Sequence, residues 1–255
     1  MIVYSHNEVL TRAIILKRPS ATCKTPYVAD IKLDESNNTL AHTPALGCCG
    51  LNDKDATVYV LPMKNPKKCT HSVELALTDD NTLVGTNPKL AETLVENCLN
   101  KNYIDTLKNV KNYNREKTFK NSRFDFHGFD ENNKEFIMEV KSVPLAKHDK
   151  RVEKKMAYFP DGYRKSKKDT ISPRALKHVN ELSEIKTENP DNIRCILCFV
   201  IQRDDVDGFM VSEDDNIYRE AVMDAYVDGV EVISIVISWN INGEASFVKM
   251  FTDFY

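Results

Sequence analysis

Three charged side chains stand at a spacing that suits metal-assisted hydrolysis of a phosphodiester bond. Asp125 lies within Ser122-Arg-Phe-Asp-Phe126, and Glu139 and Lys141 lie within Phe136-Ile-Met-Glu-Val-Lys141. Mg²⁺ prefers oxygen ligands and usually takes one or two carboxylates, with water and substrate phosphate completing its shell. A lysine beside such an ion can orient the attacking water or stabilise developing negative charge. This trio is therefore the first candidate for a catalytic site.

Both segments have the pattern of strands, in which alternate side chains point to the same face. Phe124 and Phe126 are expected on one face with Asp125 on the other, while Glu139 and Lys141 share a face. If the two strands pair as a hairpin in a suitable register, the three charged groups meet on one side. An ordinary amphipathic hairpin with a charged solvent face has the same pattern, and the residues alone leave both interpretations open.

The elements that must position this trio change in character along the chain. Short strands are expected over residues 10–17, 27–33, 56–61 and 71–77, which favours a small β-barrel or sandwich. Helices are expected after Asn87-Pro88, after Ser172-Pro173 and over residues 217–228. Further strands are expected over residues 123–127, 136–143, 194–202 and 230–239. The later part of the chain therefore predicts an α/β layer with a mixed sheet.

The composition is typical of a soluble globular protein with room for two modest domains. The chain has 255 residues and a formal net charge of −3. No apolar run reaches the roughly 18 residues of a membrane helix, so no membrane partner is expected, and an intracellular, cytoplasmic location is predicted. The seven cysteines are expected to be free buried thiols. Cys195 and Cys198 lie within an apolar run that predicts a strand, which argues against a zinc site.

Charge is distributed unevenly along the sequence. Residues 147–168 contain nine Lys or Arg against three acidic residues, and residues 204–231 contain ten acidic residues against Arg219 alone. This asymmetry fits a protein with one basic face for a polyanion. It equally fits two solvated loops, and charge alone does not separate these interpretations.

Several motifs, in order along the chain, resemble the sugar fermentation stimulation protein A family. The motifs that carry the resemblance are Ser122-Arg-Phe-Asp-Phe126, Glu139-Val-Lys-Ser-Val143, Tyr158-Phe-Pro-Asp161, Lys177-His178 with Glu181-Leu182, Phe199-Val-Ile-Gln-Arg203, His42 with Pro44, Leu94-Val-Glu96 and Gly229-Val-Glu-Val232. The resemblance runs through most of the chain.

This resemblance implies an OB-like, nucleic-acid-binding barrel at residues 1–82 and a restriction-endonuclease-like domain of the PD-(D/E)xK type at residues 83–255. It implies that Asp125 and Glu139 are metal ligands and that Lys141 is the catalytic lysine. It also implies that Glu96, on the helix after Pro88, completes the acidic site. Taken from its helical pattern alone, Glu96 lies away from the centre of the apolar stripe, which favours a solvated side chain.

The remaining candidates are basic residues that could bind a nucleic acid backbone. They are Arg123, Lys177, His178, Arg164 and Lys165 in the second domain, and Lys17 and Arg18 in the barrel. Neutralising phosphates with such side chains releases condensed counterions, which drives binding. Each of them also has an ordinary alternative, such as a carboxylate partner or a place on a solvated surface.

The sequence therefore predicts a nuclease that hydrolyses DNA with Mg²⁺, with Mn²⁺ as a second metal and RNA as a second substrate. No organic cofactor is expected, and the oligomeric state is not predicted. The alternative is a non-specific DNA-binding regulatory protein with weak or no cleavage activity.

Overall fold

The computed structural model describes residues 1–34, 37–45, 48–162 and 169–255. The strands of the first part are β1 (Ile2–Ser5), β2 (Thr11–Lys17), β3 (Val28–Lys32), β4 (Asn38–His42), β5 (Thr57–Pro62), β6 (His71–Leu77) and β7 (Leu83–Gly85). The second part contains α1 (Leu90–Asn100), β8 (Asn112–Phe119), β9 (Ser122–Phe129), β10 (Glu135–Val143), β11 (Ala146–Asp149), β12 (Lys154–Phe159), α2 (Pro173–Glu188), β13 (Ile193–Ile201), β14 (Gly208–Val211), α3 (Asn216–Val227), β15 (Glu231–Trp239) and β16 (Glu244–Phe251).

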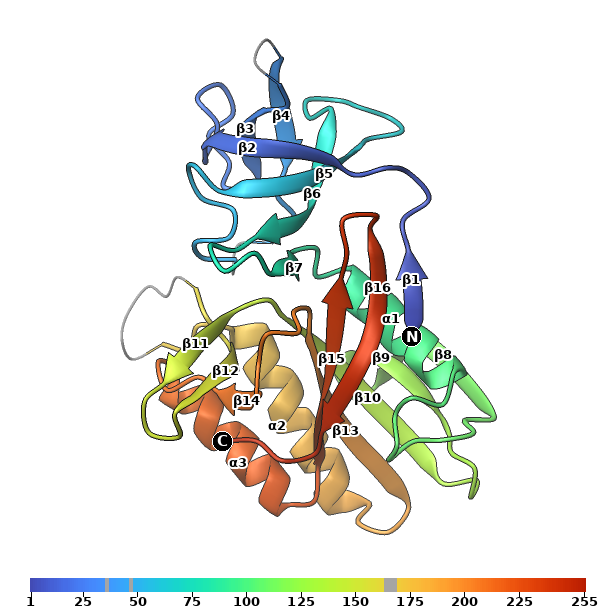
Figure 1. Ribbon diagram of the computed structural model, residues 1–255. Helices are drawn as coiled ribbons and strands as arrows, with labels where there is room; N and C mark the ends of the chain where they lie inside the picture. Colours follow the sequence, from blue (N-terminus) through green and yellow to red (C-terminus); the bar gives the residue numbers. More distant parts are fainter. Residues whose placement is uncertain (35–36, 46–47, 163–168) are drawn as a thin grey trace.

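Strands β2 to β6 form the OB-like barrel expected from the sequence, with β7 added at one edge (Figure 1). The hydrogen-bonded order is β4-β3-β2-β5-β6-β7, and a parallel pairing of β4 with β6 closes the barrel. Alternate residues point inward, so that Ala13 and Ile15 pack with Val58, Val60 and Val73 in a separate core. Alternation in the sequence therefore predicted this part of the fold correctly.

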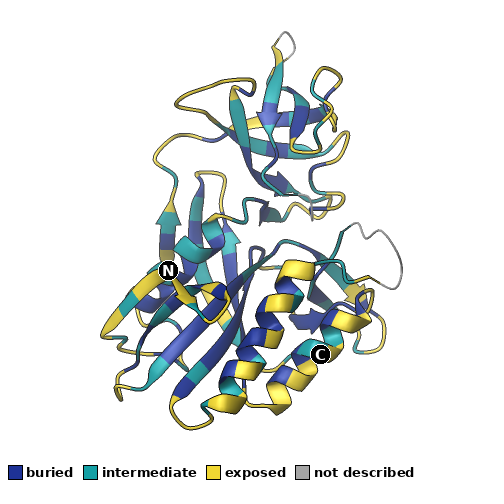
Figure 2. Cartoon of the chain, turned by 180° about the vertical axis from the view of Figure 1, so that it is seen from behind, coloured by how far each residue is buried: buried dark blue, intermediate teal, exposed yellow. Residues whose placement is uncertain are grey.

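A larger mixed sheet organises the rest of the chain, as predicted. Its order is β1-β16-β15-β13-β10-β9-β8, with parallel pairings between β10, β13 and β15. Helix α1 covers one face, while α2 and α3 cover the other and expose their outer surfaces (Figure 2). In the described ranges, no helix is both long enough and apolar enough to cross a membrane. The cysteines are free, as expected, and Cys195 and Cys198 are buried in β13, but Cys49 is exposed and Cys23 only partly buried, contrary to the expected burial.

The strand pairings do not follow the expected division at residue 82. Strand β1 pairs antiparallel with β16 and so belongs to the large sheet, although it precedes the barrel in sequence. Strand β7, after residue 82, pairs with β6 of the barrel. The barrel is therefore inserted between β1 and the rest of the α/β domain, and two chain connections tie it there.

The basic segment after β10 is only partly a loop. Residues 146–149 and 154–159 form an antiparallel hairpin, and β12 then pairs in parallel with β14 to make a small sheet. Arg151 contacts Asp149 and Glu213, so part of the basic charge is neutralised locally. The sequence missed this hairpin because charged residues obscure its alternation.

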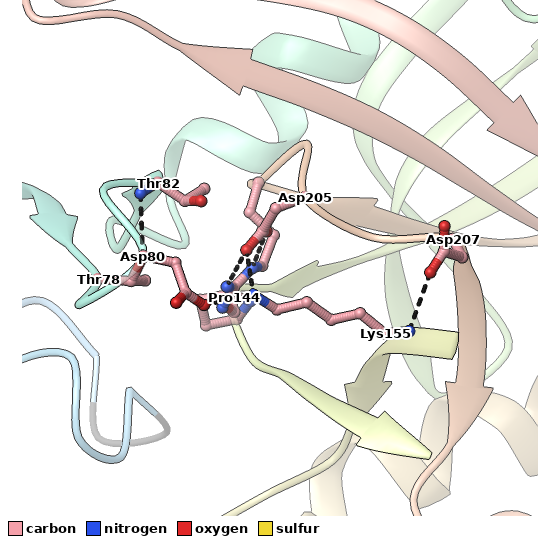
Figure 3. Close-up of polar contacts among 8 residues, drawn as sticks. Thr78, Asp80, Thr82, Pro144, Lys155, Asp205 and Asp207 are labelled. Carbon is pink, nitrogen blue, oxygen red and sulfur yellow. Dashed lines mark hydrogen bonds and ion pairs between the residues drawn. The ribbon is translucent and has the colours of Figure 1, made fainter. Parts of the chain in front are cut away.

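Lys155 of β12 connects the two domains through ion pairs (Figure 3). Its Nζ lies 3.1 Å from Oδ2 of Asp80 in the β6–β7 turn and 2.5 Å from Oδ2 of Asp205. Asp205 also accepts hydrogen bonds from Arg203, and these cations hold the pKa of its carboxyl far below the usual value against the opposing effect of burial. The Lys155–Asp80 ion pair is thus one contact between the barrel and the α/β domain.

Gly85 marks a second close approach between the domains. Its N–H donates to the Gln202 carbonyl oxygen at 2.8 Å. A Cβ at position 85 would lie 2.2 Å from Gln202 Oε1 and 2.6 Å from Trp239 Nε1. We expect Gly85→Ala to lower the free energy of unfolding by about 1–3 kcal/mol, because the junction must spread to admit the methyl group.

Urea unfolding followed by fluorescence checks this prediction, since Trp239 is the one tryptophan of the sequence. Gly85→Ala should also shift the native emission of Trp239. The control is Gly50→Ala, whose added Cβ meets no heavy atom within 4 Å among the described residues but lies at a backbone φ of +80°. It should lower stability through backbone strain alone and leave the Trp239 emission unchanged. An unchanged emission spectrum and unchanged stability in Gly85→Ala would contradict the tight junction.

Candidate active site

An interruption between β9 and β10 creates the candidate site. The two strands pair antiparallel from Glu135–Phe129 to Met138–Phe126. Beyond that point the N–H of Val140 donates to Oδ2 of Asp125 at 2.7 Å. A side-chain carboxylate thus takes up a donor of the β10 backbone, which fixes Asp125 beside the segment that carries Glu139 and Lys141.

The expected side-chain directions in β9 were partly wrong. Phe126 packs in the core under α1, whereas Phe124 belongs to the core under α2, where its ring centroid lies 6.0 Å from that of His178. The two phenylalanines therefore do not share a face, because regular pairing with β10 ends at Phe126. At this irregularity the Asp125 carboxylate binds the N–H of Val140, the residue between Glu139 and Lys141 in β10.

Glu139 lies at the centre of a buried polar group and is only 3% exposed. Its Oε1 is contacted by both Lys141 Nζ and His178 Nδ1. Burial alone would raise the pKa of Glu139, but the hydrogen bond from His178 and the charge of Lys141 outweigh it and lower the pKa. The group is therefore a carboxylate, and since a carboxylate only accepts hydrogen bonds, His178 Nδ1 carries the proton.

The other carboxylate oxygen of Glu139, Oε2, has a different environment from Oε1. Oε2 is buried and has no hydrogen-bond partner among the described residues. A buried, unsatisfied carboxylate oxygen is costly, so it calls for a specific explanation. Asp125 shows a matching effect, because burial and then the negative charge of Glu139 raise its pKa to about 7. The two carboxylates are therefore close enough for the charge of Glu139 to disfavour ionisation of Asp125.

Helix α1 contributes carboxylates in a way that the sequence did not predict. The negative charge of Glu92, in the first turn of this helix, adds to the rise in the Asp125 pKa. Glu96, one turn further along, accepts hydrogen bonds from the Tyr113 hydroxyl and from Arg115 Nη1, both at 3.2 Å. Arg115 also binds Glu92 at 2.5 Å and so links both acids. The spacing of four residues, which places Glu92 and Glu96 on one helix face, was the available signal.

His178 was expected to bind nucleic acid, but the structure buries it against Glu139 with 5% of its surface exposed. Its side chain therefore positions the carboxylate and does not face a polyanion. The reason is its place on α2, whose inner face packs over the end of β10. Lys177, the next residue back, projects outward with a half-exposed side chain, and its Nζ donates to the Asn121 carbonyl oxygen at 2.9 Å.

The other basic candidates divide into three groups. Arg123 is exposed and lies 3.5 Å from Glu116, so it has a carboxylate partner while remaining accessible. Lys17 is exposed at the end of β2. Arg18 is structural instead, because its buried guanidinium donates to the carbonyl oxygens of Pro26 and Ala45 at 2.9 and 2.8 Å. Arg164 and Lys165 lie outside the described residues.

Among the described residues, no group of three or more His, Cys, Asp and Glu side chains is arranged to hold a metal ion by itself. The candidate site offers two carboxylates, Asp125 and Glu139, with Lys141 beside them. An ion bound there would draw its further ligands from water or substrate, which is the mode that Mg²⁺ favours.

Comparison with known proteins gives relatives over nearly the whole chain. A family model described as the sugar fermentation stimulation protein RE domain matches residues 89–243. A sugar fermentation stimulation protein homolog of Clostridium perfringens strain 13 is 30% identical over 231 residues, which cover 90% of each chain. A homolog of Crocosphaera subtropica is 32% identical over 218 residues, covering 81% of this chain and 82% of the homolog.

A solved structure, that of Pyrococcus furiosus SfsA in complex with Ca²⁺, has the same fold. It superposes with a TM-score of 0.82 and 17% sequence identity, over 100% of this chain and 99% of the other. The family resemblance expected from the ordered motifs is thereby confirmed, from the barrel through the mixed sheet. The chain belongs to the sugar fermentation stimulation protein (SfsA) family.

Proposed function

We propose that this protein is a divalent-metal-dependent nuclease that hydrolyses phosphodiester bonds of DNA, with RNA as a second substrate class. The observation that carries the proposal is that Asp125 binds the Val140 N–H, between Glu139 and Lys141 in β10, while Lys141 contacts Oε1 of Glu139. These side chains come from rigid strands, so their positions are fixed before a substrate arrives. Such preorganisation is what lowers the free energy of a charged transition state.

The residues present fit a divalent cation. The buried Oε2 of Glu139 is available for coordination, and the repulsion that raises the Asp125 pKa would be offset by a positive ion. Oxygen ligands of this kind favour Mg²⁺, with Mn²⁺ as the second candidate. The Ca²⁺ complex of the P. furiosus relative supports an oxygen-ligand site in this family. When bound, such an ion would polarise the phosphate and lower the pKa of a water molecule.

The chain's own residues then have distinct tasks. The Lys141 ammonium lies beside the site and stabilises negative charge that develops on the phosphate oxygens. His178 holds Oε1 of Glu139, which leaves Oε2 directed away from that hydrogen bond. Supporting hydrogen bonds of this kind fix the orientation of a ligating carboxylate. Arg115 limits the negative charge of Glu92 next to Asp125.

Exposed basic residues of both domains support binding of a nucleic acid backbone. Lys177 and Arg123 flank the face of the sheet that carries the site, and Lys17 lies on the barrel. Their contribution is electrostatic, so binding should weaken steeply as the salt concentration rises. Arg18 is not part of this set, since its guanidinium holds barrel loops.

The test is a cleavage assay with single- and double-stranded DNA and RNA in Mg²⁺, Mn²⁺ or EDTA. We expect metal-dependent cutting that falls about 10²-fold in Lys141→Ala, because one stabilising cation is lost from the transition state. The matched control is Lys108→Ala, an accessible lysine that pairs with Asp105. Binding without cutting in every metal would instead identify a DNA-binding regulatory protein and reject the nuclease.

A further inference from the structure

A cavity of about 240 Å³ lies between the barrel and the α/β domain. Ala45 and Cys48 line it from the barrel, and Pro88, at the entrance to α1, lines it from the linking segment. Pro144 and Tyr158 of the α/β domain line it as well. It is smaller than the roughly 300–1,000 Å³ typical of pockets for drug-sized ligands. Its occupant is therefore a small group, of the size of one base or nucleoside.

Residues in or next to three elements of the candidate site, β10, α1 and α2, also line the cavity. Ser142, in its wall, directly follows Lys141 in β10. Pro88 precedes α1, which carries Glu92, and Ser172 is the N-cap of α2, which carries His178. Strand residues advance about 3.3 Å each, so the cavity begins roughly 10 Å along β10 from Glu139. A strand with one phosphate at the site can place a nearby base in it.

The wall combines flat apolar groups with a carboxylate. Tyr158 and Phe159 both line the cavity, and the Phe159 ring is fixed against the core under α2, with its centroid 5.5 Å from that of Tyr218. Asp161 accepts hydrogen bonds from the Tyr158 hydroxyl at 3.0 Å on Oδ2 and from the Gly162 N–H at 2.6 Å on Oδ1. Each oxygen of a carboxylate can accept a second hydrogen bond. Asp161 can therefore receive N–H donors from an occupant.

The surroundings of this wall also suit a polyanion. Lys147 Nζ lies 5.0 Å from the centre of the Tyr158 ring, so that a positive charge flanks the stacking surface. Rings combined with a nearby cation are the usual means of holding single-stranded nucleic acid, because every base has a face that can stack. The carboxylate adds a preference for the N–H edge of a base, which Watson–Crick pairing would conceal.

We propose that this cavity, lined by Tyr158, Phe159, Asp161 and Ser142, binds one unpaired base of the substrate strand next to the cleaved phosphate. The inference rests on the proposed function and names its substrate class as single-stranded, frayed or flipped-out nucleic acid. A base pair is too large for the cavity and offers no free N–H edge. Intact duplex must therefore open first, which costs a few kcal/mol per base.

The test compares three ligands with equal numbers of phosphates: a single-stranded DNA 10-mer, a 10-mer made only of abasic nucleotides, and a blunt hairpin whose loop is abasic. Binding to the full chain is measured by fluorescence anisotropy in Ca²⁺ and in EDTA. We expect the base-containing strand to bind about tenfold more tightly than the other two, because stacking of a base is lost in both. Equal affinity for all three ligands would overturn the proposal.

Two variants test whether the base binds in this cavity. Asp161→Asn removes the negative charge of the hydrogen-bond acceptor. Ala45→Leu fills the cavity from the barrel side and serves as the second variant if Asp161→Asn folds poorly. Either should reduce the preference for bases over abasic nucleotides to less than about threefold. The control Asp55→Asn, an exposed barrel residue, should keep the preference. A preference that survives in both cavity variants would show that the base binds elsewhere and would overturn the proposal.

Cleavage in Mg²⁺ is measured separately on the same ligands. Base preference without any cleavage would reject the nuclease and keep the base-binding cavity. Cleavage without base preference would keep the nuclease and reject the cavity. The failures of the two proposals are therefore distinguishable.

Discussion

Glu139→Gln is expected to lower metal-dependent cleavage about 10³-fold while the protein stays folded. Glutamine keeps an oxygen that can accept from Lys141 and His178, which both contact Oε1 in the native protein. The substitution removes the negative charge that would bind a divalent ion, and with it the ion's effect on water and phosphate. Cleavage kinetics in Mg²⁺ and in Mn²⁺ would measure the loss.

The same variant should change the titration of a second residue. Because the charge of Glu139 is the second cause of the raised Asp125 pKa, removing it should lower that pKa from about 7. Burial, the larger cause, remains, so the pKa should stay above the ordinary value. Carbon-detected NMR of the aspartate carboxyl groups in metal-free protein would follow this shift.

The matched control is Glu135→Gln, which lies on the same strand and also has a histidine partner, His127 at 2.7 Å. This variant should leave both cleavage and the Asp125 titration unchanged. If Glu139→Gln cut nucleic acid as fast as the native protein, the carboxylate would have no part in catalysis. The proposal of a metal site at Asp125 and Glu139 would then be rejected.

Asp125→Asn should stabilise the metal-free protein at alkaline pH. In the folded state Asp125 keeps its proton up to about pH 7, whereas an unfolded aspartate loses it near pH 3.8. Between these values the folded state binds more protons, so this group lowers the free energy of unfolding as the pH rises. Asparagine resembles the neutral acid and keeps an acceptor for the Val140 N–H. The Asp125→Asn protein therefore does not lose stability through this group as the pH rises.

The expected difference between the two proteins vanishes at pH 3.5 and reaches up to about 4 kcal/mol at pH 8. Urea unfolding in EDTA at a series of pH values would measure it. Mg²⁺ or Ca²⁺ should then stabilise the native protein at pH 8 and leave Asp125→Asn nearly unaffected, because only the native site binds the ion. The exposed control Asp55→Asn should give no pH-dependent difference. If the native protein were more stable than Asp125→Asn at pH 8 without metal, the raised pKa of Asp125 would be contradicted.

Much of the fold could be predicted because its signals are local. The expected strands of the barrel and the expected helices lie within a few residues of the observed ones, since alternation and the Asn-Pro and Ser-Pro starts are read over short windows. Strands β1, β4, β7, β8, β14 and β16 were missed, in addition to the β11–β12 hairpin. Charges interrupt the pattern in β8 and β16, and β14 is too short to show one.

The site could be predicted only in part, for reasons of long-range geometry. Asp125, Glu139 and Lys141 could be singled out as candidates because their side chains are chemically distinctive and close in sequence. The partnership of His178 with Glu139 depends on how α2 docks on the sheet, which no local pattern encodes. The same holds for Glu92, which acts on Asp125 across the packing of α1 on β9 and β10. Arg18 was misjudged because its acceptors are backbone oxygens of distant loops.

The position of β1 has a consequence for how the molecule is made. Its partner β16 is more than 200 residues away in sequence. During synthesis β1 therefore has no strand to pair with until β16 has been made. The barrel, whose strands are contiguous in sequence, can close long before then. A nascent chain should therefore hold a finished barrel beside an open sheet.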